Sequence, residues 1–313
     1  MMTSASFFLF PMGEGFAQNT VQCGNSVQNE RRFYSPGLGA MVSIQRFFAR
    51  QVLYAVLSGF CLGGMVPSAH GLTGREIMQR VNDRDDGDRM TAETEMKLVD
   101  PLGNERVRRL RTFRRHAGKD TQSLMFFLAP ADVKDTGFLT YDYDGEGKDD
   151  DQWLYLPALR RSKRIASGDK SGSFMGSDFN YSDMTKPYLD DYEFNVLGEE
   201  ELLGSRSWRI EAIPKRPAVA EATGYTKAQI WVRQDSLVVV KALRWVYKST
   251  QTKLMQVKQL ERIDGIWVAT ALEMATLQGE KTIHKTVMRQ IKTRFNQNLP
   301  DDLFTLRRLE KGP

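Results

Sequence analysis

Apolar and polar residues alternate along most of this chain, and such alternation is the pattern of half-buried β-strands. The alternation begins at residues 92–98 and returns, after a turn at 100–104, in an arginine-rich segment. Residues 123–130 are apolar on both faces, and residues 137–144 follow them as a further strand. The first half of the chain therefore predicts consecutive strands joined by short turns.

The second half of the chain repeats this pattern with longer strands. One predicted strand carries on one side Leu237, Val239, Leu243, Trp245 and Tyr247. Asp264-Gly265 is a two-residue hairpin signal that joins a strand at 252–263 to a strand at 266–277. Residues 281–295 form one more long strand. Sequential strands with short turns favour an up-and-down antiparallel sheet, and a βαβ rhythm is absent.

Helical patterns are few. Thr73 and Glu76 have capping-box spacing at the start of a short amphipathic helix, and residues 177–185 are a second helical candidate. Strands of ten or more residues curl when they share one sheet. We therefore predict an α+β fold: a large curved antiparallel sheet, forming an incomplete β-barrel, with helices covering its concave apolar face and an apolar cleft between them.

The front of the chain has the order of a secretory signal peptide. Arg46 and Arg50 supply a basic region, residues 52–66 are apolar, and small residues precede position 72. The apolar run is shorter than the roughly 20 residues of a membrane span. We expect residues 1–40 to be a spurious or disordered extension, residues 41–71 to be the signal peptide, and residues 72–313 to form one domain.

Composition argues against several function classes. Of the 44 Lys and Arg and 39 Asp and Glu residues, four and two lie in residues 1–71, which leaves 40 and 37 and a net charge of +3. Such a balance does not favour a nucleic-acid partner. Both cysteines, Cys23 and Cys61, precede residue 72. The expected mature chain has therefore no disulfide, no thiol nucleophile and no cysteine metal ligand.

Catalytic motifs are weak. Residues 72–313 contain two histidines, His116 and His284, each inside an alternating strand pattern. Ser167 and Lys170 satisfy S-x-x-K without the companion motifs of a serine acylase, so a hydrolase that uses these residues or the histidines is the least favoured hypothesis. We expect no cofactor and no enzymatic activity.

The acidic run at 142–150 has four carboxylates at positions 1, 3, 5 and 9 of a calcium loop. Trp153 occupies position 12, where a bidentate Glu belongs, and strand patterns flank the run. A hairpin tip rich in Gly and Asp is the favoured interpretation, and we expect no metal site.

Residues 149–184, "DDDQWLYLPALRRSKRIASGDKSGSFMGSDFNYSDM", resemble the signature segment of the outer membrane lipoprotein-sorting proteins, relatives of the periplasmic lipoprotein carrier LolA. The most specific parts are Trp153, Tyr155 and Pro157, the basic pair Arg160-Arg161, and the run 173–179. The similarity extends loosely over residues 72–310 and ends in an expected strand at 299–309.

This resemblance implies a half-barrel lidded by helices around a cavity for acyl chains, in a Gram-negative periplasm. It also implies a non-catalytic carrier or chaperone of lipidated proteins or free lipid, working with an inner-membrane transporter of the RND or MMPL type. We expect the protein to be a monomer. The alternative is a structural adaptor that docks such a transporter.

Aromatic residues and methionines suit an adaptable lipid-binding wall. The candidates for the cavity and its lid are Trp153, Tyr155, Phe174, Met175, Phe179, Tyr181, Met184, Trp231 and Trp245. In particular, the segment 171–184 is expected to fold across the open face of the sheet as a lid or lip. The candidates for docking an acidic partner are Arg106, Arg108 and Arg111.

Overall fold

The computed structural model describes residues 71–145 and 148–313, and the structural statements below refer to these residues. The expected extension at 1–40 and all of the expected signal peptide except Gly71 lie outside them. The described chain forms one sheet whose strands are β1 (Met90–Val99), β2 (Glu105–Ala117), β3 (Asp120–Ala129), β4 (Gly137–Asp142), β5 (Asp151–Leu156), β6 (Arg161–Arg164), β7 (Tyr192–Leu202), β8 (Ser205–Pro214), β9 (Tyr225–Arg233), β10 (Val239–Val246), β11 (Gln251–Ile263), β12 (Ile266–Gln278) and β13 (Lys281–Arg294).

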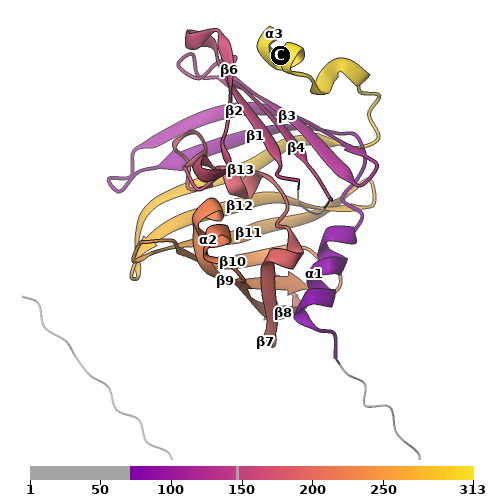
Figure 1. Cartoon of the computed structure of the whole chain (residues 1–313), viewed down its shortest axis with the longest axis vertical. Coiled ribbons are helices and arrows are strands. Elements are labelled where there is room, and N and C mark those ends of the chain that lie inside the picture. Colours follow the sequence, from indigo (N-terminus) through magenta and orange to yellow (C-terminus); the bar gives the residue numbers. More distant parts are fainter. Residues whose placement is uncertain (1–70, 146–147) are drawn as a thin grey trace, which may run out of the picture. The chain divides into compact units, whose positions relative to one another are not determined.

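All thirteen strands pair antiparallel in the order β6-β5-β4-β3-β2-β1-β13-β12-β11-β10-β9-β8-β7 (Figure 1). Each strand except β1 and β13 pairs only with its neighbours in sequence, and the β1–β13 pair joins the two halves. Because β6 and β7 lie at opposite edges, the sheet is not closed into a barrel. The predicted up-and-down antiparallel sheet is confirmed.

Short helical segments cover this sheet. They are the α-helices α1 (Gly74–Asp83), α2 (Pro217–Thr223) and α3 (Leu306–Lys311) and the 3₁₀ helices η1 (Pro157–Leu159), η2 (Ser167–Asp169), η3 (Phe174–Gly176), η4 (Tyr181–Met184), η5 (Leu189–Asp191) and η6 (Asp301–Phe304). The predicted capping box of α1 is present, since Thr73 Oγ1 accepts from the Glu76 N–H at 3.2 Å and the Thr73 N–H donates to Glu76 Oε2 at 2.8 Å.

Two rows of directly paired residues define the face of the sheet that α1 and α2 cover, which we call the inner face. Direct cross-strand partners point to the same side of a sheet. The first row is largely apolar and runs through Val196, Ile210, Ile230, Ala242, Met255, Met274, Thr286 and Leu98. The second row runs through Phe194, Ala212, Ala228, Arg244, Lys253, Thr276 and His284.

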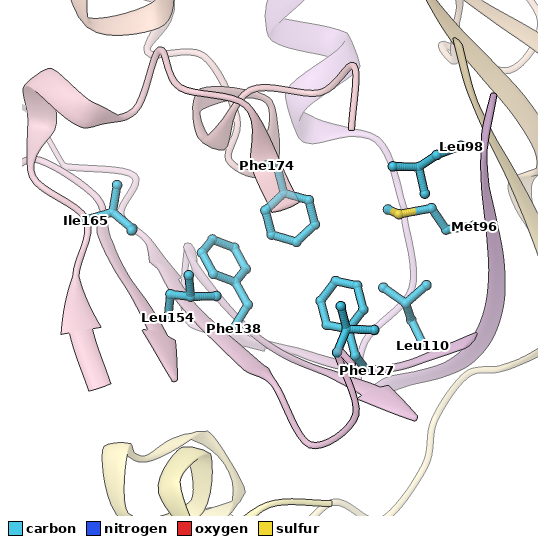
Figure 2. Packing of buried hydrophobic residues seen from close by; sticks show 9 residues of the cluster. Met96, Leu98, Leu110, Phe127, Phe138, Leu154, Ile165 and Phe174 are labelled. Atoms are coloured by element: carbon cyan, nitrogen blue, oxygen red, sulfur yellow. The ribbon is translucent and has the colours of Figure 1, made fainter. Parts of the chain in front are cut away.

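The largest buried cluster lies on the inner face of β1–β5. Phe174, 1% exposed, extends from residues 171–185, which we call the covering segment. Its ring packs between Phe138 and Phe127, at ring-centroid distances of 5.0 and 6.2 Å (Figure 2). Met96, Leu98, Leu110 and Leu154 surround these rings. The covering segment therefore supplies a central side chain of the core rather than a loose flap.

A second cluster lies on the opposite, outer face of β3–β5. It buries Leu124, Phe126 and Leu139 of the sheet beneath Leu303 and Leu309 of the C-terminal segment. The expected strand at 299–309 is therefore wrong, because this segment forms η6 and α3 instead. Helical turns place Leu303, Phe304 and Leu309 together on the sheet, and the Thr305 hydroxyl accepts from the Arg308 N–H to cap α3.

Two further expectations need correction. The helix expected at 177–185 is only η4, because Asp178 and Asn180 direct their side chains into tertiary hydrogen bonds instead of an intrahelical pattern. The strand expected from Leu237 begins at Val239 and contains a bulge. The bulge pairs Val239 with Val232 on the inner face, whereas Leu243 and Trp245 lie on the outer face.

Replacing Phe174 with Ala should destabilise the protein by about 3–5 kcal/mol, because it removes a fully buried ring and leaves a cavity. The free energy of unfolding in urea measures this loss. Leu102→Ala is the matched control, since Leu102 is 87% exposed and surface substitutions usually change stability by less than about 0.5 kcal/mol. A loss below about 1 kcal/mol for Phe174→Ala would contradict a packed covering segment.

Candidate functional site

The segment 171–185 is held on the inner face by the buried carboxylate of Asp178. Thr276 Oγ1 and Thr286 Oγ1 donate to this carboxylate at 2.5 and 2.7 Å, and His284 Nδ1 lies 2.7 Å from it. The Asp178 N–H donates to Thr286 Oγ1 at 3.0 Å. Because the side chain is 2% exposed, its polar contacts come from these groups of β12 and β13 rather than from water.

Lys253 of β11 holds the next part of the same segment. Its Nζ donates to the Asp178 carbonyl and to Asn180 Oδ1, both at 2.6 Å. Burial lowers the pKa of Lys253, while the charges of Asp183 and Asp178 act in the opposite direction. Asn180 Nδ2 also donates to the Thr223 carbonyl of α2 at 3.1 Å. Segment, sheet and α2 are thus joined through one polar network.

Gly224 permits this close contact. Its φ of +83° is a left-handed conformation that favours glycine, and a Cβ built there would lie 2.7 Å from Asn180 Nδ2. The tip of the segment has a similar requirement, because Met175 and Gly176 have φ angles of 52° and 71°. The backbone around the tip closes as a hairpin, in which the Phe174 N–H donates to the Phe179 carbonyl at 2.7 Å.

Five of the predicted cavity residues belong to the inner-face cluster. Phe174 is buried, and the partly buried residues packed against the same cluster include Met175, Phe179, Tyr181 and Met184. They fill the inner face of β1–β5 rather than border an open space.

The other four predicted cavity residues lie on the outer face. Trp153 and Tyr155 pair directly with Leu139 and Gly137 and pack beside the C-terminal segment. Trp231 and Trp245 lie on the outer face of β9 and β10, under the ammonium groups of Lys241 and Lys227, at 4.1 and 4.4 Å from the ring centroids.

The three candidate docking arginines lie on two faces. Arg106 and Arg108 are on the inner face, where Arg108 is 8% exposed and donates to the Met175 carbonyl at 2.6 Å. Arg111 lies on the outer face, 3.2 Å from Glu93. Arg108 thus helps to hold the covering segment.

The residues of the least favoured hydrolase hypothesis bind different partners, although Ser167, Lys170 and His116 all line one cleft. Ser167 Oγ donates to Asp149 at 2.6 Å, and Lys170 Nζ donates to the Asp150 carbonyl at 2.8 Å. His284 belongs to the Asp178 network described above. His116 belongs to another network, in which Nε2 lies 2.8 Å from Asp86 Oδ1.

The surroundings of His116 have an order that resembles an acyl-transfer site. Its Nδ1 lies 3.2 Å from Thr121 Oγ1, so a hydroxyl, an imidazole and the carboxylate of Asp86 follow one another. Arg114 also binds Asp86, at 2.9 Å. Burial would raise the pKa of Asp86, but the His116 hydrogen bond and the Arg114 charge outweigh it and hold the pKa at about 2. The carboxylate is therefore shared with a guanidinium instead of being reserved for the imidazole.

A cleft of about 1460 Å³ opens over the inner face of β7–β10, beside the covering segment at 171–185. None of the predicted cavity residues lines it. Its apolar floor and walls include Met78, Phe194, Ala212, Val219, Ala228 and Ile230. The cleft exists because the side chains of the second inner-face row are small at this place, where the row carries Ala212 and Ala228. The helices α1 and α2 stand on either side.

Charged groups surround the mouth of the cleft. Asp142 and Asp150 lie at its β4–β5 end, near Lys170 and Lys186. Burial, followed by the charge of Asp150, raises the pKa of Asp142 to about 7. Burial likewise raises the pKa of Asp150. The cleft thus combines an apolar floor with an ionic rim, an arrangement suited to an amphiphile.

No three His, Cys, Asp or Glu side chains in the described ranges are grouped so that they could hold a metal ion. Among the same residues, every helix is too short or too polar to cross a membrane.

Sequence reasoning missed the alanines of the cleft and the charged residues at its mouth. Ala212 and Ala228 carry no chemical signal of their own, and their role depends on a register across seven strands. Asp178 was visible within the "GSDF" motif, but its partners Thr276, His284 and Thr286 lie about a hundred residues away. The one signal for these partners in the sequence is the alternation that places Thr and His on a strand face that is otherwise apolar.

Comparisons with known proteins agree with this fold. A family model described only as an uncharacterized protein matches residues 119–311. A solved DUF1329 family protein from Desulfovibrio piger is 30% identical with a TM-score of 0.68, and the match covers 75% of this chain and 97% of that one. No curated protein matches the chain.

Two further solved structures are similar. One, described as an outer membrane lipoprotein-sorting protein domain from Vibrio parahaemolyticus, is 31% identical with a TM-score of 0.68, over 76% of this chain and 98% of that one. A LolA superfamily protein from Nitrosomonas europaea is 18% identical with a TM-score of 0.56, over 75% and 98%. The latter shows a shared fold.

Replacing Asp142 with Asn should stabilise the protein at pH 8 and have little effect at pH 4. Unfolded, this carboxyl ionises near pH 4, whereas the folded chain keeps it protonated to about pH 7. Its ionisation therefore costs folding free energy that grows as the pH rises from about 4 to about 7. We expect a gain on the order of 2 kcal/mol at pH 8, about half of the full shift because solvent reaches part of the site.

Urea unfolding at pH 4, 6 and 8 measures this dependence. Asp144→Asn is the matched control, because Asp144 is two residues away and its side chain is 56% exposed. A difference between wild type and Asp142→Asn that stays constant over the three pH values would contradict the buried carboxyl.

Proposed function

The chain belongs to the DUF1329 family and has the LolA-like fold, and from this premise we propose that it is a non-catalytic carrier of lipidated proteins or lipids. The cleft over β7–β10 is the observation that carries the proposal. Its volume of about 1460 Å³ exceeds the roughly 300–1,000 Å³ of ordinary small-molecule pockets. The charged mouth leaves room for a polar group beside an enclosed chain.

The driving force for binding is removal of apolar surface from water. Each buried CH₂ contributes about 0.8 kcal/mol, so a chain of several methylenes is held strongly by a floor that forms few hydrogen bonds. Phe194 and Ile230 of the floor and Met78 of the α1 wall offer such an apolar surface, since they line the cleft together. Because no covalent step is needed, release follows from a competing acceptor for the same chain.

The proposal places the protein in the periplasm. Residues 41–71 have the order of a signal peptide, and one similar structure is described as an outer membrane lipoprotein-sorting domain. Residues 72–313 would then be the mature carrier, working as a monomer. An inner-membrane transporter of the RND or MMPL type is the proposed source of cargo, and this part rests on the family resemblance alone.

Replacing Ala228 with Trp should reduce binding of a fluorescent acyl-ester probe at least tenfold, because the indole would occupy the floor of the cleft. Ala228 is half-buried and lines the cleft, so the larger side chain has space to enter it. Probe titration gives the affinity, and native mass spectrometry of the purified protein shows whether lipid is retained.

Ala271→Trp is the matched control, because Ala271 is a half-buried alanine of the same sheet outside the cleft. It should bind the probe as the wild type does. A wild-type protein that neither retains lipid nor binds the probe would contradict the carrier function. Equal losses in the two variants would show that the cleft is not the binding site.

A further inference from the structure

Arg244 stands at the inner end of the cleft, in the same row as the two alanines of its floor. Cross-strand pairing runs from Ala212 to Ala228 and from Ala228 to Arg244. On the other side, Arg244 is the cross-strand partner of Lys253, whose Nζ donates to the Asp178 carbonyl of the covering segment. Arg244 therefore lies at the boundary between the open floor of the cleft and the filled part of the inner face.

The guanidinium of Arg244 has donors that the protein does not use. Among the described arginines that line the cleft, Arg75, Arg84 and Arg216 each donate hydrogen bonds to protein oxygens. Arg244 donates none to the residues that the structure describes, and its Nη1 is buried without a partner there. Its side chain is 22% exposed and lines the cleft, and its guanidinium carbon lies 5.6 Å from the centroid of the Tyr225 ring. A buried donor without an acceptor is costly, and a ligand oxygen would relieve that cost.

The carboxylate nearest to Arg244 is already occupied. Asp183 Oδ2 accepts from the Tyr225 hydroxyl and from the Asn180 N–H, both at 2.7 Å. Its Oδ1 lies 3.9 Å from Arg244 Nε, beyond hydrogen-bond distance. Asp183 therefore balances the charge of Arg244 without satisfying its donors.

The balance of charges around Arg244 favours a neutral hydrogen-bond acceptor over an ionised one. Two cations, Arg244 and Lys253, face two carboxylates, Asp178 and Asp183, within one connected and largely buried network that His284 joins through its contact with Asp178. With His284 neutral, these four charges balance. An ionised headgroup would add an uncompensated negative charge at low dielectric, whereas a neutral carbonyl accepts a hydrogen bond without adding any charge.

We propose that Arg244 binds the carbonyl oxygen of an ester- or amide-linked acyl chain whose methylenes lie along Ala228, Ala212 and Ile230. This inference rests on the proposed carrier function and adds the linkage that the site recognises. A charged donor directed at a neutral carbonyl gives specificity, because a chain lacking that oxygen leaves the guanidinium unpaired.

The test compares two probes that differ in one oxygen. Monolauroylglycerol has an ester carbonyl, and dodecylglycerol ether has the same headgroup and chain length without it. Competition against the fluorescent acyl-ester probe measures both affinities, and laurate is included as an ionised chain. We expect the ester to bind roughly 10- to 100-fold more tightly than the ether, the range for a hydrogen bond to a charged group. Laurate should bind more weakly than the ester.

Arg244→Met should abolish the difference between ester and ether while leaving the affinity for the ether within about threefold. Arg209→Met is the control, because Arg209 lies on the outer face of β8 and pairs with Glu200 at 3.0 Å. It should keep the preference for the ester.

The outcomes separate the two proposals. If neither glyceride binds to the wild type, the carrier function fails. If ester and ether bind equally well to the wild type, the carrier function stands and the role of Arg244 is overturned, a result that needs no variant. If laurate binds more tightly than the ester and loses this affinity in Arg244→Met, the acceptor is an anion and the carbonyl proposal is overturned.

Discussion

The buried carboxylate of Asp178 determines how the inner face of the sheet is divided. A charge that is 2% exposed persists only when surrounding groups match it, and Thr276, Thr286 and His284 do so from two strands. This contact fixes the segment 171–185 over β1–β5 and brings Phe174 into the core. The opposite half of the inner face, over β7–β10, is left for the cleft. The filled and open halves are thus two results of one interaction.

Side-chain size and charge along a single row then give the open half its character. Ala212 and Ala228 lower the floor, Arg244 ends it, and Lys253 beyond them is held by the covering segment. A carrier needs an apolar surface that holds a chain and a polar point that orients it. The second inner-face row supplies both the apolar surface and the polar point within four strands. The helices α1 and α2 enclose the cleft on either side. The proposed function therefore rests on the change from small apolar to charged side chains along this row, and not on a catalytic group.

The sequence predicted the architecture well, because alternation and hairpin signals act over short distances. The Thr73 capping box and the Asp264-Gly265 turn are where their spacing places them. The C-terminal helix α3 was missed, since Leu303 and Leu309 become a helical stripe only against the outer face of β3 and β4. The cleft could not be predicted from aromatic content: a large ring fills space, as Phe174 does, and the space was created by small residues whose register spans the sheet.

Photo-crosslinking with an acyl chain that carries a diazirine tests the central claim most directly, because the adduct records where the chain lies. Peptide mapping after irradiation should place adducts on apolar residues that line the cleft, such as Met78, Phe194 and Ile230. Adducts confined to the segment 171–185 or to the outer face would contradict the account, as would equal labelling in the presence of excess unlabelled acyl ester.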